Sequence, residues 1–189
     1  MTPSILLLTK ILSLFTIIGG LIVVDIIVLL LAKKLWKQNS FIDWGLNLYG
    51  RHGLLLAFGV VFFATVSSLF FSSVAGFVPC ALCWWQRIFL YPQVILLGLA
   101  LWKKDSGVVL YGIVLSIIGG VIAIYHTYLQ FGGSPILPCS ANVAASCAQR
   151  YFLEFGYVTI PTMALTSFTL IALLLYSYKR YSLSITNSH

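Results

Sequence analysis

The chain has 189 residues, of which 60% are hydrophobic and only 8% are charged. Soluble domains average about 25% charged residues, so this composition excludes an ordinary soluble domain, and it is too apolar for a disordered chain. The net charge of +7 comes from basic residues that lie mostly between apolar runs or at their ends. They are too few and too scattered for a nucleic-acid-binding groove, and they are typical of the topology signals of a membrane protein.

Five apolar runs are each about as long as the roughly 20 residues that a membrane-spanning helix requires. They cover residues 11–32, 54–76, 84–102, 107–129 and 157–178. The first run continues past Asp25 and is not followed by a small-residue cleavage site, so we expect a retained helix and not a signal peptide. The remaining segments are too short to form a domain of their own. The sequence therefore predicts an all-α membrane protein with five spans.

The distribution of basic residues predicts the orientation of these spans. One set of connections carries eight of them, namely Lys33, Lys34, Lys37, Arg51, Lys103, Lys104, Lys179 and Arg180. The opposite set carries three, namely Lys10, Arg87 and Arg150. Because basic residues favour the cytoplasmic side, loops 33–53 and 103–106 and the C-terminus are predicted to be cytoplasmic. The N-terminus and loops 77–83 and 130–156 then face outside.

All four cysteines fall on the predicted outer side, where disulfides persist. Cys80 and Cys83 form a C-x-x-C pattern directly before the third run, and Cys139 and Cys147 lie in the long outer loop. Three interpretations are open: structural disulfides, a zinc site built from four thiolates, and redox chemistry. The spacing between Cys139 and Cys147 is wider than that of a usual zinc knuckle, and an oxidising compartment disfavours free thiolates.

Redox chemistry has a physical basis at the C-x-x-C pattern. The start of a helix stabilises a thiolate through the helix dipole, and so does a nearby cation. Arg87 follows Cys83 by four residues and thus lies one helical turn further along. We therefore favour a redox-active pair over structural disulfides and over zinc, and we expect no metal site.

The surroundings of this pair resemble a known family. Residues 79–92, Pro-Cys-Ala-Leu-Cys-Trp-Trp-Gln-Arg-Ile-Phe-Leu-Tyr-Pro, closely resemble the signature of the DsbB family, most of all its shorter BdbC-type branch. Residues 125–130 are similar to the His-x-x-Leu-Gln exit from that family's third helix, and residues 155–161 to the entry of its last helix. The resemblance covers about residues 50–180 and implies a four-helix transmembrane bundle.

This chain departs from the family pattern by an additional N-terminal run. We therefore expect three parts. Residues 1–45 form an extra transmembrane helix and a cytoplasmic loop, residues 46–181 form the DsbB-like domain, and residues 182–189 form a cytoplasmic tail. The resemblance does not assign a role to the first part or to Asp25.

The resemblance implies a relay of two disulfides, Cys139–Cys147 and Cys80–Cys83, in a bacterial inner membrane. A DsbA-like thioredoxin-fold partner outside the cytoplasm would reduce Cys139, and Cys147 would then attack Cys80. Cys83 would be released as the thiolate that faces a membrane quinone, either ubiquinone or menaquinone. The expected partners are thus the DsbA-like protein, membrane lipid and the quinone pool. No nucleic-acid partner is expected.

Two further residues are expected at the quinone. Arg87 lies one turn after Cys83 and would stabilise negative charge on the thiolate and on a quinone oxygen. His126 ends its helix on the same side and, by the family match, would be a quinone neighbour. Gln86 and Gln130 are weaker candidates of the same kind.

Two other functions stay open at this point. A small membrane transporter with structural disulfides usually has several charges within its spans and an internal repeat, whereas this chain offers Asp25 and no convincing repeat. A vitamin K epoxide reductase-like protein also combines a helical bundle, a C-x-x-C pattern and quinone chemistry. That family carries its active pattern late in the bundle, whereas here it opens the second helix of the four.

Overall fold

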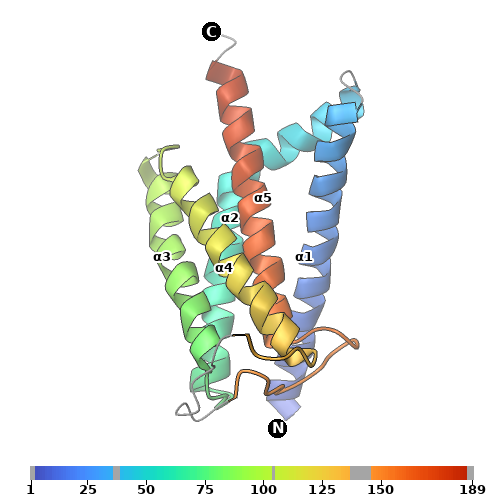
Figure 1. Cartoon of the computed structure of the whole chain (residues 1–189). Coiled ribbons are helices and arrows are strands. Elements are labelled where there is room, and N and C mark those ends of the chain that lie inside the picture. The colour runs from blue at the N-terminus through green and yellow to red at the C-terminus, as the bar shows by residue number, and fades with distance from the viewer. Residues whose placement is uncertain (1–2, 36–38, 104, 137–145, 187–189) are drawn as a thin grey trace.

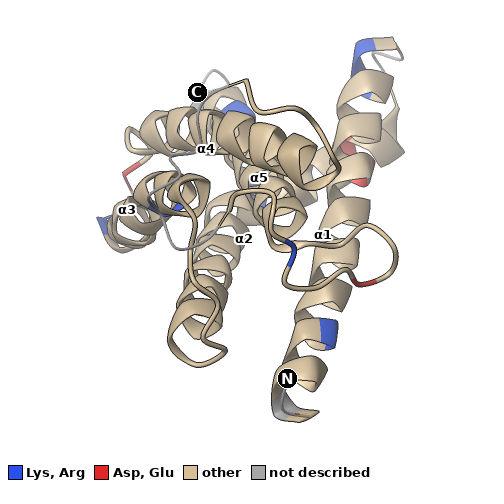
Figure 2. Ribbon diagram, turned by 60° about the horizontal axis from the view of Figure 1, so that its bottom comes forward, with Lys and Arg blue, Asp and Glu red and all other residues tan. Residues whose placement is uncertain are grey.

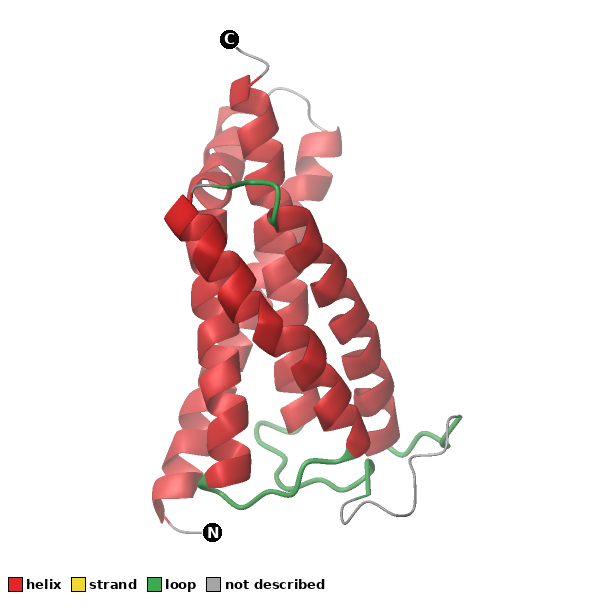
Figure 3. Ribbon diagram, turned by 90° about the vertical axis from the view of Figure 1, so that its left-hand side faces the viewer, coloured by secondary structure: helices red, strands yellow, loops and turns green. Residues whose placement is uncertain are grey.

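The structure is a computed structural model that describes residues 3–35, 39–103, 105–136 and 146–186. It is built from five helices, and the described part of the chain has no β-structure beyond an isolated bridge between Glu154 and Val158 (Figure 3). The helices are α1 (Pro3–Leu35), α2 (Ser40–Ser73), α3 (Ala81–Lys103), α4 (Val109–Gln130) and α5 (Ile160–Thr186) (Figure 1). The predicted all-α membrane fold is confirmed.

Helices α2 to α5 form a four-helix bundle, and α1 packs on its outside against α5 and α2 (Figure 1). The bundle core is apolar and includes the fully buried Leu97 of α3, Ala123 of α4 and Ile171 of α5. Ile26 is buried in the same core and anchors α1 to it. Many other large apolar side chains of α1 are exposed, which suits a helix surrounded by lipid.

Two glycines decide how closely neighbouring helices approach α5. A Cβ atom added at Gly53 of α2 would lie 2.6 Å from the backbone oxygen of Leu174, and one at Gly119 of α4 would lie 2.4 Å from the ring of Phe168. Carbon atoms do not approach this closely without displacing their neighbours. The absent side chains therefore let α2 and α4 pack directly on α5, as small residues do in membrane helix pairs.

The second helix begins well before the second apolar run. The prediction of a loop over residues 33–53 is wrong for most of its length, because α2 starts at Ser40. The side chain of Asn39 caps this start by accepting a hydrogen bond from the backbone N–H of Phe41. Polar residues in this first part lower its hydropathy without breaking the helix, since one of its faces packs against α1 and α5 at Gly45 and Gly50.

Other boundaries also differ from the apolar runs. Helix α2 ends at Ser73 instead of residue 76, because the chain turns at Gly76, whose φ is +71°. Helix α5 begins at Ile160 and continues to Thr186, beyond the run at 157–178 and through most of the expected tail at 182–189. The boundary expected between residues 45 and 46 lies inside α2.

Four of the five helices, α1, α2, α4 and α5, are long and apolar enough to cross a membrane. Helix α3, the third predicted span, falls outside this set because Gln86, Arg87 and Gln93 lower its hydropathy. It nevertheless packs in the bundle beside α2 and α4 (Figure 1). The chain is thus a multi-pass membrane protein, and the helix that falls short of the hydropathy of a span is the one that follows the C-x-x-C pattern.

The two ends of the bundle carry different connections (Figure 1). The start of α1, the α2–α3 loop and the described parts of the α4–α5 connection lie at one end. The end of α1, the start of α2, the α3–α4 turn and the end of α5 lie at the other. Viewed from the first end, Figure 2 shows few charged residues along the helices. This grouping of the connections agrees with the alternation that the basic residues predict.

Asp25, the acidic residue inside the first apolar run, has a hydrogen-bond partner in α2. The hydroxyl of Tyr49 donates to its Oδ2 at 2.8 Å. The bond joins α1 to α2 within the apolar part of the protein, where it adds a polar contact to the packing at Ile26.

Candidate active site

The C-x-x-C pattern lies at the start of α3. Cys80 directly precedes the helix and Cys83 is in its first turn, where the backbone N–H of Trp84 donates to the oxygen of Cys80 at 3.1 Å. Both cysteines are free thiols, and their Sγ atoms lie 3.2 Å apart at hydrogen-bond distance. Exchange between this reduced pair and a disulfide therefore needs only a small movement of the two side chains. The disulfide form stays a prediction.

His126 of α4 reaches across to the cysteine pair. Its Nε2 lies 3.6 Å from Cys80 Sγ, and its Nδ1 lies 3.0 Å from Gln86 Nε2 of α3. If the Gln86 amide donates to Nδ1, the ring proton is on Nε2 and points at the Cys80 sulfur. The histidine is only 2% exposed, so this hydrogen bond is shielded from water.

These contacts favour the anionic form of Cys80. The hydrogen bond with Cys83, followed by that with His126, outweighs the opposing effect of burial and lowers the pKa of Cys80 below the usual range of a thiol. A thiolate is the form that attacks disulfides and that leaves from them most readily. The reduced pair is thus prepared for thiol–disulfide exchange.

Cys147 lies close to this pair. It is 2% exposed and shares one buried cluster with Cys80 and Leu129. Cys147 is disulfide-bonded. Cys139, with which the family resemblance pairs it, lies outside the described residues, so the identity of that bridge stays a prediction.

Aromatic stacking holds the loop after Cys147 over the C-x-x-C pattern. The rings of Phe77 and Tyr151 stack with centroids 4.4 Å apart, and the Tyr151 hydroxyl donates to the oxygen of Val78 at 2.8 Å. Gln130, at the end of α4, donates from Nε2 to the backbone oxygen of Gln149 at 2.9 Å. These contacts join the two loops that carry the cysteines.

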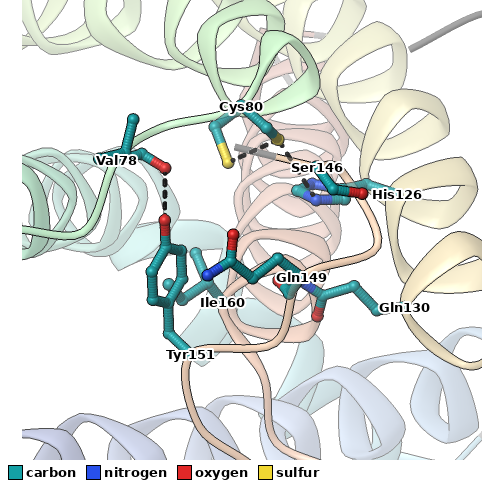
Figure 4. A pocket seen from close by; sticks show the side chains of 9 residues that line it. Val78, Cys80, His126, Gln130, Ser146, Gln149, Tyr151 and Ile160 are labelled. Atoms are coloured by element: carbon teal, nitrogen blue, oxygen red, sulfur yellow. Dashed lines mark hydrogen bonds between the residues drawn. The ribbon is translucent and has the colours of Figure 1, made fainter. Parts of the chain in front are cut away.

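A cavity of about 20 Å³ lies between the two loops (Figure 4). It is lined by Val78, Cys80, Cys83, His126, Gln130, Ser146, Gln149, Tyr151 and Ile160. This volume holds about one water molecule and excludes a quinone ring. A quinone that reacts with Cys83 must therefore approach from another side of α3.

Arg87 points to a different neighbour than His126 does. Its Nε donates to Ser68 Oγ and its Nη2 to Ser68 O, both at 3.0 Å, and its guanidinium lies 5.3 Å from the ring centroid of Trp84. Tyr91 also donates to Ser68 Oγ, at 3.2 Å. Ser68 of α2 thus positions Arg87, a role that sequence reasoning missed. The pair of serines at 67–68 within an apolar run was the available signal.

The structure therefore separates the predicted residues into two groups. Cys80, Cys83, His126 and Cys147 come together at one end of the bundle, where Gln86 and Gln130 join them. Arg87 instead faces α2. The quinone contacts expected for Arg87 and His126 stay predictions.

Fold and site together define a helical membrane protein with a C-x-x-C pair and a nearby disulfide-bonded cysteine at one end of its bundle. The family model of the disulfide bond formation protein DsbB matches residues 50–177. The chain belongs to the DsbB family of disulfide bond formation proteins. The matched residues leave out α1, and no solved structure matches the chain.

Individual relatives agree with this assignment. The probable disulfide formation protein C of Bacillus cereus is 42% identical over 122 residues, which are 65% of this chain and 88% of the relative. Disulfide bond formation protein C of Bacillus subtilis is 44% identical over 115 residues, 59% of this chain and 81% of the relative. The probable disulfide formation protein of Metapseudomonas resinovorans is 38% identical over 145 residues, 76% of this chain and 95% of the relative.

Proposed function

We propose that this membrane disulfide-forming protein reoxidises a DsbA-like, thioredoxin-fold partner and transfers the electrons to a membrane quinone. The main support is the burial of the disulfide-bonded Cys147 in one cluster with Cys80 of the reduced C-x-x-C pair. A structural disulfide has no need of a second, thiol-bearing pair beside it, whereas a relay requires that the two pairs meet.

The proposed relay transfers two electrons in balanced exchange steps. The partner's thiolate attacks Cys139 and forms a mixed disulfide, which the partner's second thiol resolves, so that Cys139 and Cys147 become thiols. Cys147 then attacks Cys80 of the Cys80–Cys83 disulfide, Cys83 leaves, and Cys139 closes the outer disulfide again. Cys80 and Cys83 finally lose two electrons and two protons to a quinone and re-form their own disulfide.

The residues around Cys83 suit a quinone that approaches from the lipid. Trp84 and Ile88 are each 54% exposed on α3, on a lipid-accessible surface next to Arg87. Because lipid lowers the local dielectric, the cation of Arg87 stabilises negative charge on Cys83 or on a quinone oxygen more strongly than it would in water. We propose that Arg87 contacts the quinone and that His126 stabilises the thiolate of Cys80.

The test of this function uses the purified full-length protein in lipid nanodiscs with soluble ubiquinone or menaquinone analogues. A reduced thioredoxin-fold partner should be oxidised with one quinone reduced per disulfide formed, followed by the quinone absorbance. A Cys80→Ser, Cys83→Ser double variant should have no quinone turnover. Partner oxidation that proceeds equally without quinone, or in this variant, would contradict the proposal.

We also propose that the cysteines face the periplasmic or outer side of a bacterial inner membrane. The eight basic residues that the sequence assigns to the cytoplasmic connections support this orientation, and those among them that end α1 and α3, namely Lys33, Lys34 and Lys103, lie at the opposite end of the bundle. Reporter fusions after Lys37, Lys104 and Arg180 are expected to be cytoplasmic, and a fusion at Ser134 is expected to be external. A cytoplasmic reporter at Ser134 would reverse the orientation, and a mature protein that lacks α1 would contradict the retained first helix.

A further inference from the structure

Cys80, Cys83 and His126 form a set of metal-binding side chains. Their potential ligand atoms, two sulfurs and one imidazole nitrogen, all lie within 4.8 Å of one another. Two thiolates and a neutral histidine are a ligand set that zinc prefers, and ligand atoms bound to one tetrahedral zinc ion lie at similar separations. This set differs from the four cysteines considered from the sequence, because His126 takes part and Cys147 is disulfide-bonded.

The surroundings of this set suit a bound ion. Zinc-bound histidines usually hold their second ring nitrogen against a hydrogen-bond partner, and Gln86 occupies that position at Nδ1. For Nε2 to bind zinc, the ring proton must move to Nδ1, and the Gln86 amide can then accept it through its oxygen. The same side chain thus supports both protonation patterns of His126.

A second observation at this site is a buried acceptor without a partner. Gln130 lines the cavity beside the three ligands and is 6% exposed, and its Oε1 has no hydrogen-bond partner. The cavity has room for about one water molecule. A water bound to zinc as its fourth ligand would donate to this oxygen and satisfy it.

We propose that the reduced form of the protein binds one Zn²⁺ ion through Cys80, Cys83 and His126, with a water as the fourth ligand. This inference rests on the proposed function, because that function requires the pair to pass through a reduced state. Binding releases the thiol proton of Cys83 and any proton that Cys80 still carries, and it involves no electron transfer. The oxidised pair offers no thiolates and does not bind. Zinc therefore competes with reoxidation of the C-x-x-C pair and acts as a reversible inhibitor.

The experiment compares the oxidised and reduced full-length protein in nanodiscs. Cobalt(II), a spectroscopic substitute for zinc, should produce visible absorption with sulfur-to-metal charge transfer only in the reduced form. Zinc should displace the cobalt at one ion per chain. A Cys139→Ser, Cys147→Ser double variant should behave in the same way, because the second pair is not part of the site.

Three variants separate the loss of a zinc ligand from the loss of its hydrogen-bond partner and from a general effect of replacing a histidine. His126→Ala should weaken zinc binding by more than the roughly 10- to 100-fold that loss of an outer-shell partner costs, and Gln86→Leu should weaken it within that range. His52→Ala is the matched control, because His52 is exposed on α2, and it should bind as the parent does.

Equal binding to the oxidised and reduced forms, a cobalt spectrum without sulfur charge transfer, or equal affinities of the His126→Ala and His52→Ala proteins would overturn the inference. In the quinone assay, zinc should halt turnover and a chelator should restore it. Turnover that zinc does not affect would overturn this inference and leave the proposed function intact. Zinc binding in a protein without quinone turnover would overturn the proposed function instead.

Discussion

In a Cys147→Ser variant, the thioredoxin-fold partner is expected to accumulate as a mixed disulfide with Cys139. Without Cys147, the lone Cys139 thiol attacks the disulfide of the oxidised partner, the partner's second cysteine leaves as a thiol, and no internal thiol is present to displace the bound partner from Cys139. In a Cys139→Ser variant the same complex should be scarce, because the partner's target is absent. A non-reducing gel of membranes, with the partner detected by antibody, measures both outcomes.

Both variants should lose partner oxidation almost completely. The Cys80–Cys83 pair should remain competent, and a small dithiol should still drive quinone reduction through it. A purely structural Cys139–Cys147 disulfide leads to a different outcome. Either substitution would then destabilise the loop equally, and neither variant would trap a partner. Equal trapping in both variants would contradict the assigned order. Retained oxidation without any trapping would contradict the relay.

Replacement of Arg87 by leucine is expected to slow quinone reduction by roughly 100-fold, the usual cost of removing a preorganised group that stabilises developing negative charge. The apparent KM for quinone should rise, while both cysteine pairs should still form disulfides with a chemical oxidant. Arg87→Lys should recover part of the rate, because it keeps the charge but loses the paired contact with Ser68. Quinone kinetics measured on the purified variants provide the comparison.

Variants of Ser68 separate the effect of the position of Arg87 from the effect of its charge. Ser68→Ala removes the hydroxyl that accepts from Arg87 Nε and from Tyr91 but leaves the charge of Arg87 intact. We expect the KM for quinone to rise about tenfold, which corresponds to the lower end of the range for one hydrogen bond to a charged group, with little change in kcat. Ser68→Thr, which retains the hydroxyl, should restore the parent KM. If the Arg87→Leu protein had the quinone kinetics of the parent, the proposed quinone contact of Arg87 would be contradicted, and Arg87 would only anchor α3 at the membrane interface.

Zinc inhibition and the thiol relay would use the same chemical property of the site. His126 and Cys83 favour a thiolate at Cys80, which speeds exchange but also creates a soft metal ligand. Under the proposed function, the fraction of the chain that slow quinone turnover leaves reduced would determine the sensitivity of the protein to zinc.

Several features of this protein follow from its sequence alone. A segment in lipid must satisfy its backbone hydrogen bonds internally, so long apolar runs predict helices, and the four-helix bundle with an added N-terminal helix is as expected. Consecutive spans alternate in direction, which places the 77–83 loop and the described parts of the 130–156 loop at one end, where Cys80, Cys83 and Cys147 lie. The helices and their alternation need only the linear order of apolar and polar residues, whereas the division into a four-helix bundle and an added helix was implied by the resemblance to the DsbB family.

The contacts of the site depend on how each helix is rotated about its axis, which apolar runs do not specify. Packing at Gly53 and Gly119 fixes how α2 and α4 lie on α5. His126 of α4 then faces Cys80, 46 positions away in the chain, while Ser68 of α2 meets Arg87. The early start of α2 also lies outside the hydropathy pattern, because its first turns are capped by Asn39 and pack against α1 at Gly45 and against α5 at Gly50. Side-chain fit between helices, absent from the hydropathy of any one of them, decided these features.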